Sequence, residues 1–275
     1  MARVIAICNQ KGGTGKTTTA INLAVYLALQ GSKVVLIDLD PQGNSTSGLG
    51  AEKDNLKGTS YDVLINNIDI SSLLADTCVN ELKLVPANID LIGAELELAG
   101  EENRERKLLQ AIDSIKKDFD YFIIDSPPSL GLITLNALVA ADSVIIPVQC
   151  EYFALEGLGQ LIKTINLIKE GFNPNLEIEG VLLTMADFRT NLTADVINET
   201  RSFFKEKVFR TIIPRSIKLA EAPGFGKPIY SYDRASIGAV KYEELAKEIG
   251  VHSSDRELSI NKEVVSDANS VNTSV

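Results

Sequence analysis

Five short, mostly apolar runs constrain the fold of this 275-residue chain more than any other feature of its sequence. Strands that read as continuous apolar runs are buried on both faces of a parallel sheet. Strands that alternate with helices build βαβ units with right-handed crossovers. The sequence therefore predicts an α/β fold with a doubly wound, mostly parallel sheet and helices on both faces. The expected strands cover residues 3–8, 33–38, 121–125, 143–148 and 178–184.

The segments between these runs carry apolar residues at helical spacing. We expect helices over 18–30, 95–117, 131–141 and 154–170. An apolar fraction of 45% is ordinary for a folded chain, and one large core fits this length, so we expect a single domain over 1–252. Beyond residue 250 the apolar periodicity is lost, which predicts a disordered tail over 253–275.

A glycine-rich loop joins the first expected strand to the first expected helix. Its sequence is Lys11-Gly12-Gly13-Thr14-Gly15-Lys16-Thr17, followed by Thr18. A loop that grips a triphosphate needs inward backbone N–H groups, glycines that permit the turn, and a helix N-terminus behind it. Lys16 is placed for the β- and γ-phosphates, Thr17 for Mg²⁺ and Thr18 for the α-phosphate. The loop therefore predicts an ATP and Mg²⁺ site.

Three aspartates stand at or just beyond the carboxyl ends of expected strands, where open α/β sheets bind their ligands. They are Asp38, Asp40 and Asp125. Asp125 is followed by Ser-Pro-Pro at 126–128, an arrangement like a Walker B segment, whose carboxylate holds Mg²⁺. Aspartates also end strands simply because they suit turns, and that alternative stays open at this point.

Composition excludes several other kinds of site. The net charge of −10 restricts any nucleic-acid contact to a local basic surface. His252 is the only histidine, which excludes histidine-based triads and histidine-rich metal sites. Cys8, Cys78 and Cys150 lack metal-ligand spacing, so we expect buried, inert thiols in a reducing compartment. No apolar run approaches the length of a membrane span.

The phosphate loop departs from the usual pattern because Gln10 occupies the first glycine position and Lys11 adds a second lysine. It resembles the deviant Walker A signature of the ParA/MinD/nitrogenase iron-protein superfamily. The resemblance implies a homodimer that encloses two ATP molecules, with Lys11 of each subunit on the phosphates of its partner's ATP. A second cation at the transferred phosphoryl group stabilises developing charge, which assigns catalytic roles to Lys11 and Lys16.

Other segments extend the resemblance over about residues 2–250. The segment 38–44 resembles the first switch of ParA proteins, which implies that Asp40 orients the attacking water and that Asp38 supports the magnesium shell. The segments 147–157, 184–190 and 213–229 are also similar to ParA/Soj proteins. By this resemblance Pro214 and Ser216 lie against the adenine, with Met185 nearby.

Two branches of the superfamily match less well. Cys78 and Cys150 do not stand where iron proteins hold a cluster. Residues 266–275 lack the basic amphipathic face that attaches MinD proteins to membranes. The chain begins directly with its first strand, as in the short, Soj-like type without an N-terminal helix-turn-helix extension.

The Soj-like type implies a cytoplasmic, nucleoid-associated protein that segregates chromosomes or plasmids. ATP makes it a dimer, the dimer binds double-stranded DNA without sequence preference, and a ParB/Spo0J-like partner stimulates hydrolysis. Between 187 and 227 the chain has eight basic and five acidic residues, a local excess that permits DNA binding. The resemblance implies DNA contacts by Arg189, Arg215, Lys218 and Lys227, although such residues also occur on ordinary solvated faces.

Two other classes of protein share the phosphate loop. A metabolic synthetase or kinase would need an acceptor pocket, of which the region 184–228 gives no sign. A positioning ATPase, MinD-like or for other non-DNA cargo, would keep the same switch and lose the basic surface.

Overall fold

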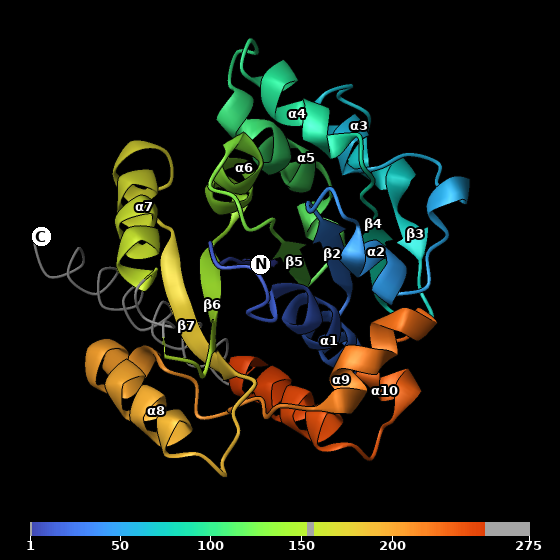
Figure 1. Cartoon of the computed structure of the whole chain (residues 1–275). Helices are drawn as coiled ribbons and strands as arrows, with labels where there is room; N and C mark the ends of the chain where they lie inside the picture. The colour runs from blue at the N-terminus through green and yellow to red at the C-terminus, as the bar shows by residue number, and fades with distance from the viewer. Residues whose placement is uncertain (1, 153–156, 251–275) are drawn as a thin grey trace, which may run out of the picture.

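A seven-stranded sheet forms the centre of the computed structural model, which describes residues 2–152 and 157–250 (Figure 1). The strand order is β3-β4-β2-β5-β1-β6-β7, and every pairing is parallel except that of β3 with β4. The strands are β1 (Arg3–Ile7), β2 (Val34–Asp38), β3 (Ala75–Asp76), β4 (Leu82–Val85), β5 (Tyr121–Asp125), β6 (Ser143–Gln149) and β7 (Glu177–Thr184). The prediction of a mostly parallel α/β sheet is therefore confirmed.

Helices cover both faces of this sheet. They are α1 (Lys16–Leu29), α2 (Asn44–Gly48), α3 (Ser60–Leu64), α4 (Leu91–Leu98), α5 (Lys107–Ile115), α6 (Leu132–Ala140), α7 (Leu158–Gly171), α8 (Asn191–Phe204), α9 (Ile217–Glu221) and α10 (Ile229–Tyr232), and the chain is helical again over 237–250. Figure 1 shows α4 to α7 on one side of the sheet and α1, α9 and α10 on the other.

Alternation along β1 explains why the sheet needs both layers. Val4 and Ala6 belong to the core cluster that includes residues of α5, α6 and α7, whereas Ile5 and Ile7 belong to the cluster that includes α1 and the segment 237–250. Successive side chains of a strand point to opposite faces, so a strand without polar residues must be covered twice. The apolar run therefore determines a three-layer structure.

The expected strands all form, but some sequence predictions were wrong in detail. β3 and β4 were not predicted, and the helix expected over 95–117 is broken between α4 and α5, where Asn103 has a φ of 54°. Residues 153–156 and the tail expected over 253–275 lie outside the described residues, so the domain boundary at 252 stays a prediction. Cys78 is exposed, because it lies in the loop between β3 and β4 at the surface, whereas Cys8 and Cys150 are buried as expected.

Across the described ranges, no helix combines the length and the apolar character that a membrane span requires.

Two glycines join α2 to the segment before α10. Gly50 has a φ of 81° and Gly226 a φ of 61°. A Cβ on Gly50 would lie 2.9 Å from the carbonyl oxygen of Gly226, and one on Gly226 would lie 3.1 Å from the Cα of Gly50. Because both contacts are with backbone atoms, a side chain here has no room, and glycine is required at both positions.

We expect Gly50→Ala to lower the free energy of unfolding by about 1–3 kcal/mol, because it combines a left-handed backbone with a backbone clash. Gly171→Ala is the matched control: that glycine ends α7, and a Cβ there meets nothing within 4 Å. Thermal unfolding of the two variants checks the prediction. Equal melting temperatures for Gly50→Ala and Gly171→Ala would show that the Gly50–Gly226 contact is not tight.

Candidate nucleotide site

The loop from Lys11 to Thr17 follows β1 and leads directly into α1. Gly13 and Gly15 have φ values of 74° and 88°, a left-handed conformation that glycine adopts without strain. Gly15 is the N-cap of α1 and no side chain caps this end, so first-turn N–H groups are available to a ligand. A Cβ built on Gly12 or Gly13 meets nothing within 4 Å, which leaves open space over the loop. The arrangement is a cradle for an anion.

The side chains of Asn9, just after β1, and of Thr184, on β7, fix the loop in place. Asn9 donates from Nδ2 to the carbonyl of Pro147 at 2.6 Å and accepts from the backbone N–H of Lys11 at 3.0 Å. Thr184, at the end of β7, donates to the carbonyl of Thr14 at 2.8 Å. Asn9 and Thr184 were not predicted as site residues, although both stand at the ends of expected strands.

The two lysines of the loop differ in exposure. Lys16 is buried and its ammonium lies 3.2 Å from the carbonyl oxygen of Lys11, so the chain folds it over its own loop. Burial lowers the pKa of Lys16, while the nearby carboxylates of Asp125 and Asp40 oppose that effect. Lys11 is exposed at the surface. The loop thus holds one cation inward and presents the other outward.

The register of the sheet brings the predicted carboxylates together. Asp38 at the end of β2 is paired with Asp125 at the end of β5, and both are buried. Asp38 accepts hydrogen bonds from the N–H and the hydroxyl of Thr46, each at 2.8 Å, and from the N–H of Asp40 at 3.1 Å. Both of its oxygens therefore hold the loop after β2, which makes Asp38 a positioning residue in this structure.

Asp125 has one carboxylate oxygen that no hydrogen-bond donor occupies. Its Oδ2 accepts from the hydroxyl of Ser45 at 2.8 Å, while Oδ1 is buried without a partner. Burial, and then the charge of Asp38, raise the pKa of Asp125 to about 8, partly offset by hydrogen bonds from Ser45 and Thr17. Burial likewise raises the pKa of Asp38 to about 6. An orphaned buried oxygen beside the hydroxyl of Thr17 fits a cation.

Asp40 lies in the loop that these contacts hold. Its Oδ1 accepts from the N–H of Gln42 at 2.9 Å, and its carbonyl accepts from the N–H of Gly43 at 2.8 Å. The side chain is buried, and its charge acts on both Lys16 and Asp125. The structure therefore brings all three predicted aspartates to the phosphate loop. Among the described residues, no group of three or more His, Cys, Asp or Glu side chains is arranged to hold a metal ion.

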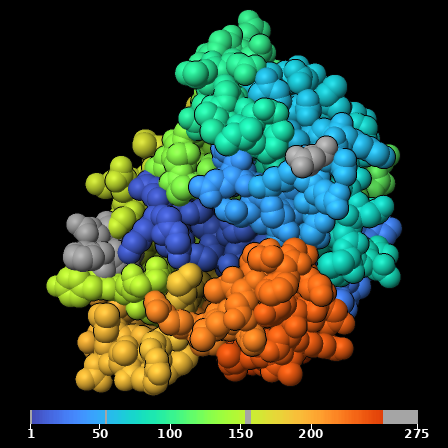
Figure 2. Space-filling view, turned by 45° about the vertical axis from the view of Figure 1, so that its right-hand side comes forward, coloured from blue at the N-terminus to red at the C-terminus, as the bar shows by residue number. Residues whose placement is uncertain are grey.

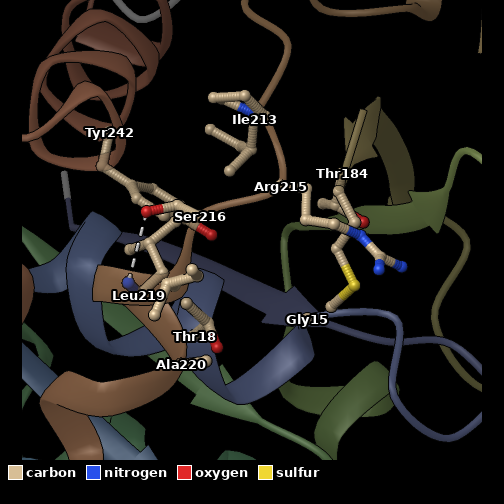
Figure 3. Close-up of a pocket in the computed structure, with 12 residues that line it drawn as sticks. Gly15, Thr18, Thr184, Ile213, Arg215, Ser216, Leu219, Ala220 and Tyr242 are labelled. Atoms are coloured by element: carbon tan, nitrogen blue, oxygen red, sulfur yellow. Dashed lines mark hydrogen bonds between the residues drawn. The ribbon is translucent and has the colours of Figure 1, made fainter. Parts of the chain in front are cut away.

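A cavity of about 400 Å³ opens beside the loop. It is lined by Gly15, Thr18, Thr184, Met185, Ile213, Pro214, Arg215, Ser216, Ile217, Leu219, Ala220 and Tyr242. In Figure 3, Tyr242, Ser216 and Leu219 lie on one side of it and Thr184 and Arg215 on the other. The predicted residues Met185, Pro214 and Ser216 all line this cavity, whereas Ile213, Leu219 and Tyr242 were missed.

Backbone contacts shape the wall of this cavity. Met185 has a φ of 52°, an uncommon conformation for a residue with a side chain. The next residue, Ala186, forms a parallel bridge with Pro214: its N–H donates to Ile213 at 3.1 Å, and the N–H of Arg215 donates to Ala186 at 3.0 Å. An apolar cavity with few polar groups beside an anion cradle suits a purine base.

Of the four basic residues predicted to contact DNA, Arg215 lines the cavity. Arg189 is 87% exposed, and its Nε and Nη2 lie 2.8 and 2.6 Å from the carboxylate of Asp187. Lys218 is 3.2 Å from Glu221. The Arg215 guanidinium is 3.7 Å from Glu151, and Lys227 is exposed. Three of these cations therefore have a carboxylate neighbour.

We expect the apoprotein to lose stability as pH rises from about 4 to about 8, because the folded state holds the Asp125 proton across a range in which an unfolded aspartate has lost it. Asp125→Asn removes this cost. Its melting temperature at pH 8 in EDTA should exceed that of the unchanged protein by about 2–4 °C, the effect of about 1 kcal/mol in a domain of this size.

The advantage of Asp125→Asn should shrink at pH 5, where the native carboxyl is protonated. Asp113→Asn, an exposed change on α5, is the control and should leave the melting temperature unchanged at both pH values. An Asp125→Asn protein that melts below the unchanged chain at pH 8 would contradict the raised pKa.

Comparisons with known proteins agree with this geometry. A family model described as an AAA domain matches residues 2–178. The chain is 53% identical over 252 residues to the sporulation initiation inhibitor protein Soj of Bacillus subtilis (strain 168), covering 92% of this chain and 100% of Soj. It is 54% identical over 249 residues to the chromosome partitioning protein ParA of Myxococcus xanthus (strain DK1622), covering 90% and 88% of the two chains.

One solved structure is similar over nearly the whole described chain. It is that of a cobyrinic acid a,c-diamide synthase from Mycobacterium smegmatis with bound ADP and magnesium, 40% identical, with a TM-score of 0.79 and coverage of 90% of this chain and 93% of that one. The identity to Soj and ParA is higher, and those matches cover 92% and 90% of this chain. The chain therefore belongs to the ParA/Soj family of chromosome-partitioning ATPases.

Proposed function

We propose that this chain is a DNA-segregation ATPase whose ATP-bound dimer binds double-stranded DNA without sequence preference. Hydrolysis, stimulated by a ParB/Spo0J-like partner, returns it to a non-binding monomer. One observation carries the proposal: the apolar cavity shares Gly15 and Thr18 with the anion cradle, and Asp125, whose Oδ1 has no partner, lies close enough for its charge to act on Lys16 of the same loop. A base, a chain of phosphates and a cation fit that site in this order.

The residues divide the binding of Mg²⁺-ATP among them. Met185, Pro214 and Ser216 hold the base in the cavity. The backbone of residues 12–15 and the hydroxyl of Thr18 contact the phosphates, with Lys16 on the β- and γ-phosphates. Thr17 and Asp125 ligate Mg²⁺, and Asp38 supports them by holding the loop after β2. The bound cation neutralises charge on the phosphates. The ADP and magnesium in the related structure support this assignment.

Hydrolysis needs a positioned water and a second cation. Asp40 orients the water, since its carboxylate is fixed by the N–H of Gln42 and lies close enough for its charge to act on Lys16 and Asp125. Lys11 is exposed, which supports a role on the phosphates of a second subunit. A cation supplied by another chain makes hydrolysis conditional on dimer formation, as an arginine finger does.

The basic residues form the DNA contacts. Arg189, Arg215, Lys218 and Lys227 are offered by loops and short helices around the cavity, so one dimer presents two sets. Doubling the contacts steepens the salt dependence and makes DNA affinity depend on ATP. This arrangement supports nucleoid association and a cycle in which the partner protein releases the dimer from DNA.

A second candidate function is a metabolic synthetase, since the related structure is named a synthase and has ADP and magnesium bound. Such an enzyme must bind an acceptor beside the γ-phosphate. The cavity beside the loop accounts for a base, and the identity to partition proteins is higher. Filter binding of non-specific DNA separates the two functions: a partition ATPase retains DNA with ATP and not with ADP, whereas a synthetase retains it with neither.

Asp40→Ala should lower ATP turnover at least about 100-fold, because it removes the group that orients the water. ATP binding should persist, so the variant should accumulate as an ATP-bound dimer in size-exclusion chromatography with light scattering. Asp113→Ala, on the exposed face of α5, is the control for the removal of a carboxylate. A monomer in ATP, or turnover equal to the control, would exclude this role for Asp40.

Arg189→Ala should reduce the slope of log K against log salt by about 2 for the ATP-bound dimer, because each of the two subunits then neutralises one DNA phosphate fewer. Arg189→Glu should abolish DNA binding at moderate salt, while ATP-dependent dimerisation continues. Lys117→Glu makes an equal change of charge at an exposed position before β5 and should bind DNA normally. Unaltered binding by Arg189→Glu would place the DNA surface elsewhere.

A further inference from the structure

The chain turns sharply directly after Asp40. Two backbone groups of this turn point back to that residue. The N–H of Gln42 donates to Oδ1 of Asp40 at 2.9 Å, and the N–H of Gly43 donates to the carbonyl of Asp40 at 2.8 Å. Pro41 stands at the second position of the turn, where its fixed φ is favourable. One side of the turn therefore holds both the carboxylate and the carbonyl of Asp40.

A lysine eleven residues farther along the chain holds the opposite side of the turn. The Nζ of Lys53 donates to the carbonyl of Gln42 at 2.5 Å. Because a peptide group is planar, the carbonyl of Gln42 and the N–H of Gly43 move together. The peptide group between residues 42 and 43 is therefore fixed at both ends, with its N–H on Asp40 and its carbonyl on the lysine.

Glycine gives this turn a freedom that the lysine removes. Gly43 has a φ of 59°, and a residue without a Cβ lets the adjacent peptide group rotate more easily than any other residue does. A Cβ here would lie 2.7 Å from the carbonyl oxygen of Ala87, and 2.9 and 3.1 Å from Cε and Nζ of Lys53. The lysine side chain therefore packs directly on the most mobile residue of the turn.

Lys53 has no acidic partner that would explain its position. It is exposed, in a single 3₁₀ turn over Lys53–Asn55. Among the described side chains, no carboxylate lies within 4.0 Å of its ammonium. A hydrogen bond from a charged donor is stronger than one between neutral groups. The contact with the carbonyl of Gln42 is thus the interaction that Lys53 makes, and it acts on the loop after β2.

The turn stands between Lys53 and the nucleotide site. Lys53 is not among the residues that line the cavity beside the phosphate loop, whereas the charge of Asp40 acts on Lys16 and Asp125. Figure 2 shows the blue and light-blue surface of the segments after β2 next to the dark-blue surface of the N-terminal segments. This arrangement favours an action of Lys53 through the turn over a contact with the nucleotide.

We propose that Lys53 is a positioning residue for ATP hydrolysis. Its ammonium holds the peptide group between Gln42 and Gly43, and that peptide group keeps the carboxylate of Asp40 in the orientation that directs the attacking water. The effect on turnover rests on the role proposed for Asp40. The hold on the turn does not, so the two are measured separately.

The first measurement is amide hydrogen exchange by NMR on the full chain without nucleotide. Lys53→Met keeps most of the apolar stem and removes the ammonium, and the N–H groups of Gln42 and Gly43 should then exchange about tenfold faster. Lys57→Met is the matched control, since Lys57 is an exposed lysine four residues later whose charge acts on Asp76. It should leave the exchange of both N–H groups unchanged.

The second measurement is steady-state ATP hydrolysis. Lys53→Met should lower kcat about five- to tenfold, the effect of one lost hydrogen bond from a charged donor. The KM for ATP should stay within about twofold, because a group that acts through Asp40 serves the transition state and not the binding of ATP. Lys53→Arg keeps a cationic donor and should recover most of the rate. Lys57→Met should hydrolyse ATP normally.

A double variant tests whether Lys53 acts through Asp40. If it does, Lys53→Met should cause no further loss of turnover in a chain that already has Asp40→Ala. An Asp40→Ala chain that hydrolyses ATP at the normal rate would refute the role proposed for Asp40. The exchange measurement would still decide whether Lys53 holds the turn.

Three outcomes would overturn the proposal. One is equal exchange of the Gln42 and Gly43 N–H groups in Lys53→Met and Lys57→Met, with circular dichroism showing that both are folded. Another is a Lys53→Met protein with a raised KM and an unaltered kcat, which would make Lys53 a nucleotide contact. The third is an equal loss of turnover from Lys53→Met with and without Asp40→Ala, which would place its effect elsewhere.

Discussion

The pairing of Asp38 with Asp125 at the ends of two adjacent parallel strands is the constraint on which the rest of the site depends. Two buried carboxylates repel each other and need donors. Thr46 and Ser45 supply those donors, and both come from α2. The short helix is therefore held against the sheet by hydrogen bonds to charge as well as by packing. The loop that carries Asp40 is held in position by its hydrogen bonds to the carboxylates of Asp38 and Asp125 at the strand ends.

The same pair of carboxylates leaves one hydrogen-bond acceptor without a donor. Asp125 retains a buried oxygen without a donor, in a fold that otherwise satisfies its buried polar groups with few exceptions among the described residues. Such a group lowers the stability of the empty protein and favours a ligand that completes it. The ammonium of Lys16 already contacts the carbonyl of Lys11 in its own loop. The loop is therefore organised before any phosphate binds.

Sequence reasoning succeeded where the signal was local and continuous. The long apolar strands and the glycine loop were predicted, whereas β4 was missed because its four residues, Leu-Lys-Leu-Val at 82–85, include a charge and form too short a run. Ile213 and Leu219 were missed although they stand in the same segment as the predicted Pro214 and Ser216, because the sequence does not tell which side chains of that segment face the cavity. Tyr242 was missed because only folding brings the distant segment 237–250 to the cavity. The exposure of Ile92 and Leu96 on α4 could not be predicted, since the apolar spacing of a helix does not tell which of its faces is covered.

The bridge between Ala186 and Pro214 has a consequence beyond the shape of the cavity. It fastens the loop of Arg189 to the loop of Arg215, and Met185, Pro214 and Ser216 in the same two loops face the interior of the cavity. The two sides of this unit share one stretch of backbone. If a ligand in the cavity shifts this unit and the shift alters its outer surface, the ligand changes the affinity of that surface for a second molecule, and thermodynamic reciprocity makes the converse effect equal in size. The bridge thus joins the wall of the cavity and the loops that carry Arg189 and Arg215 in one structural unit.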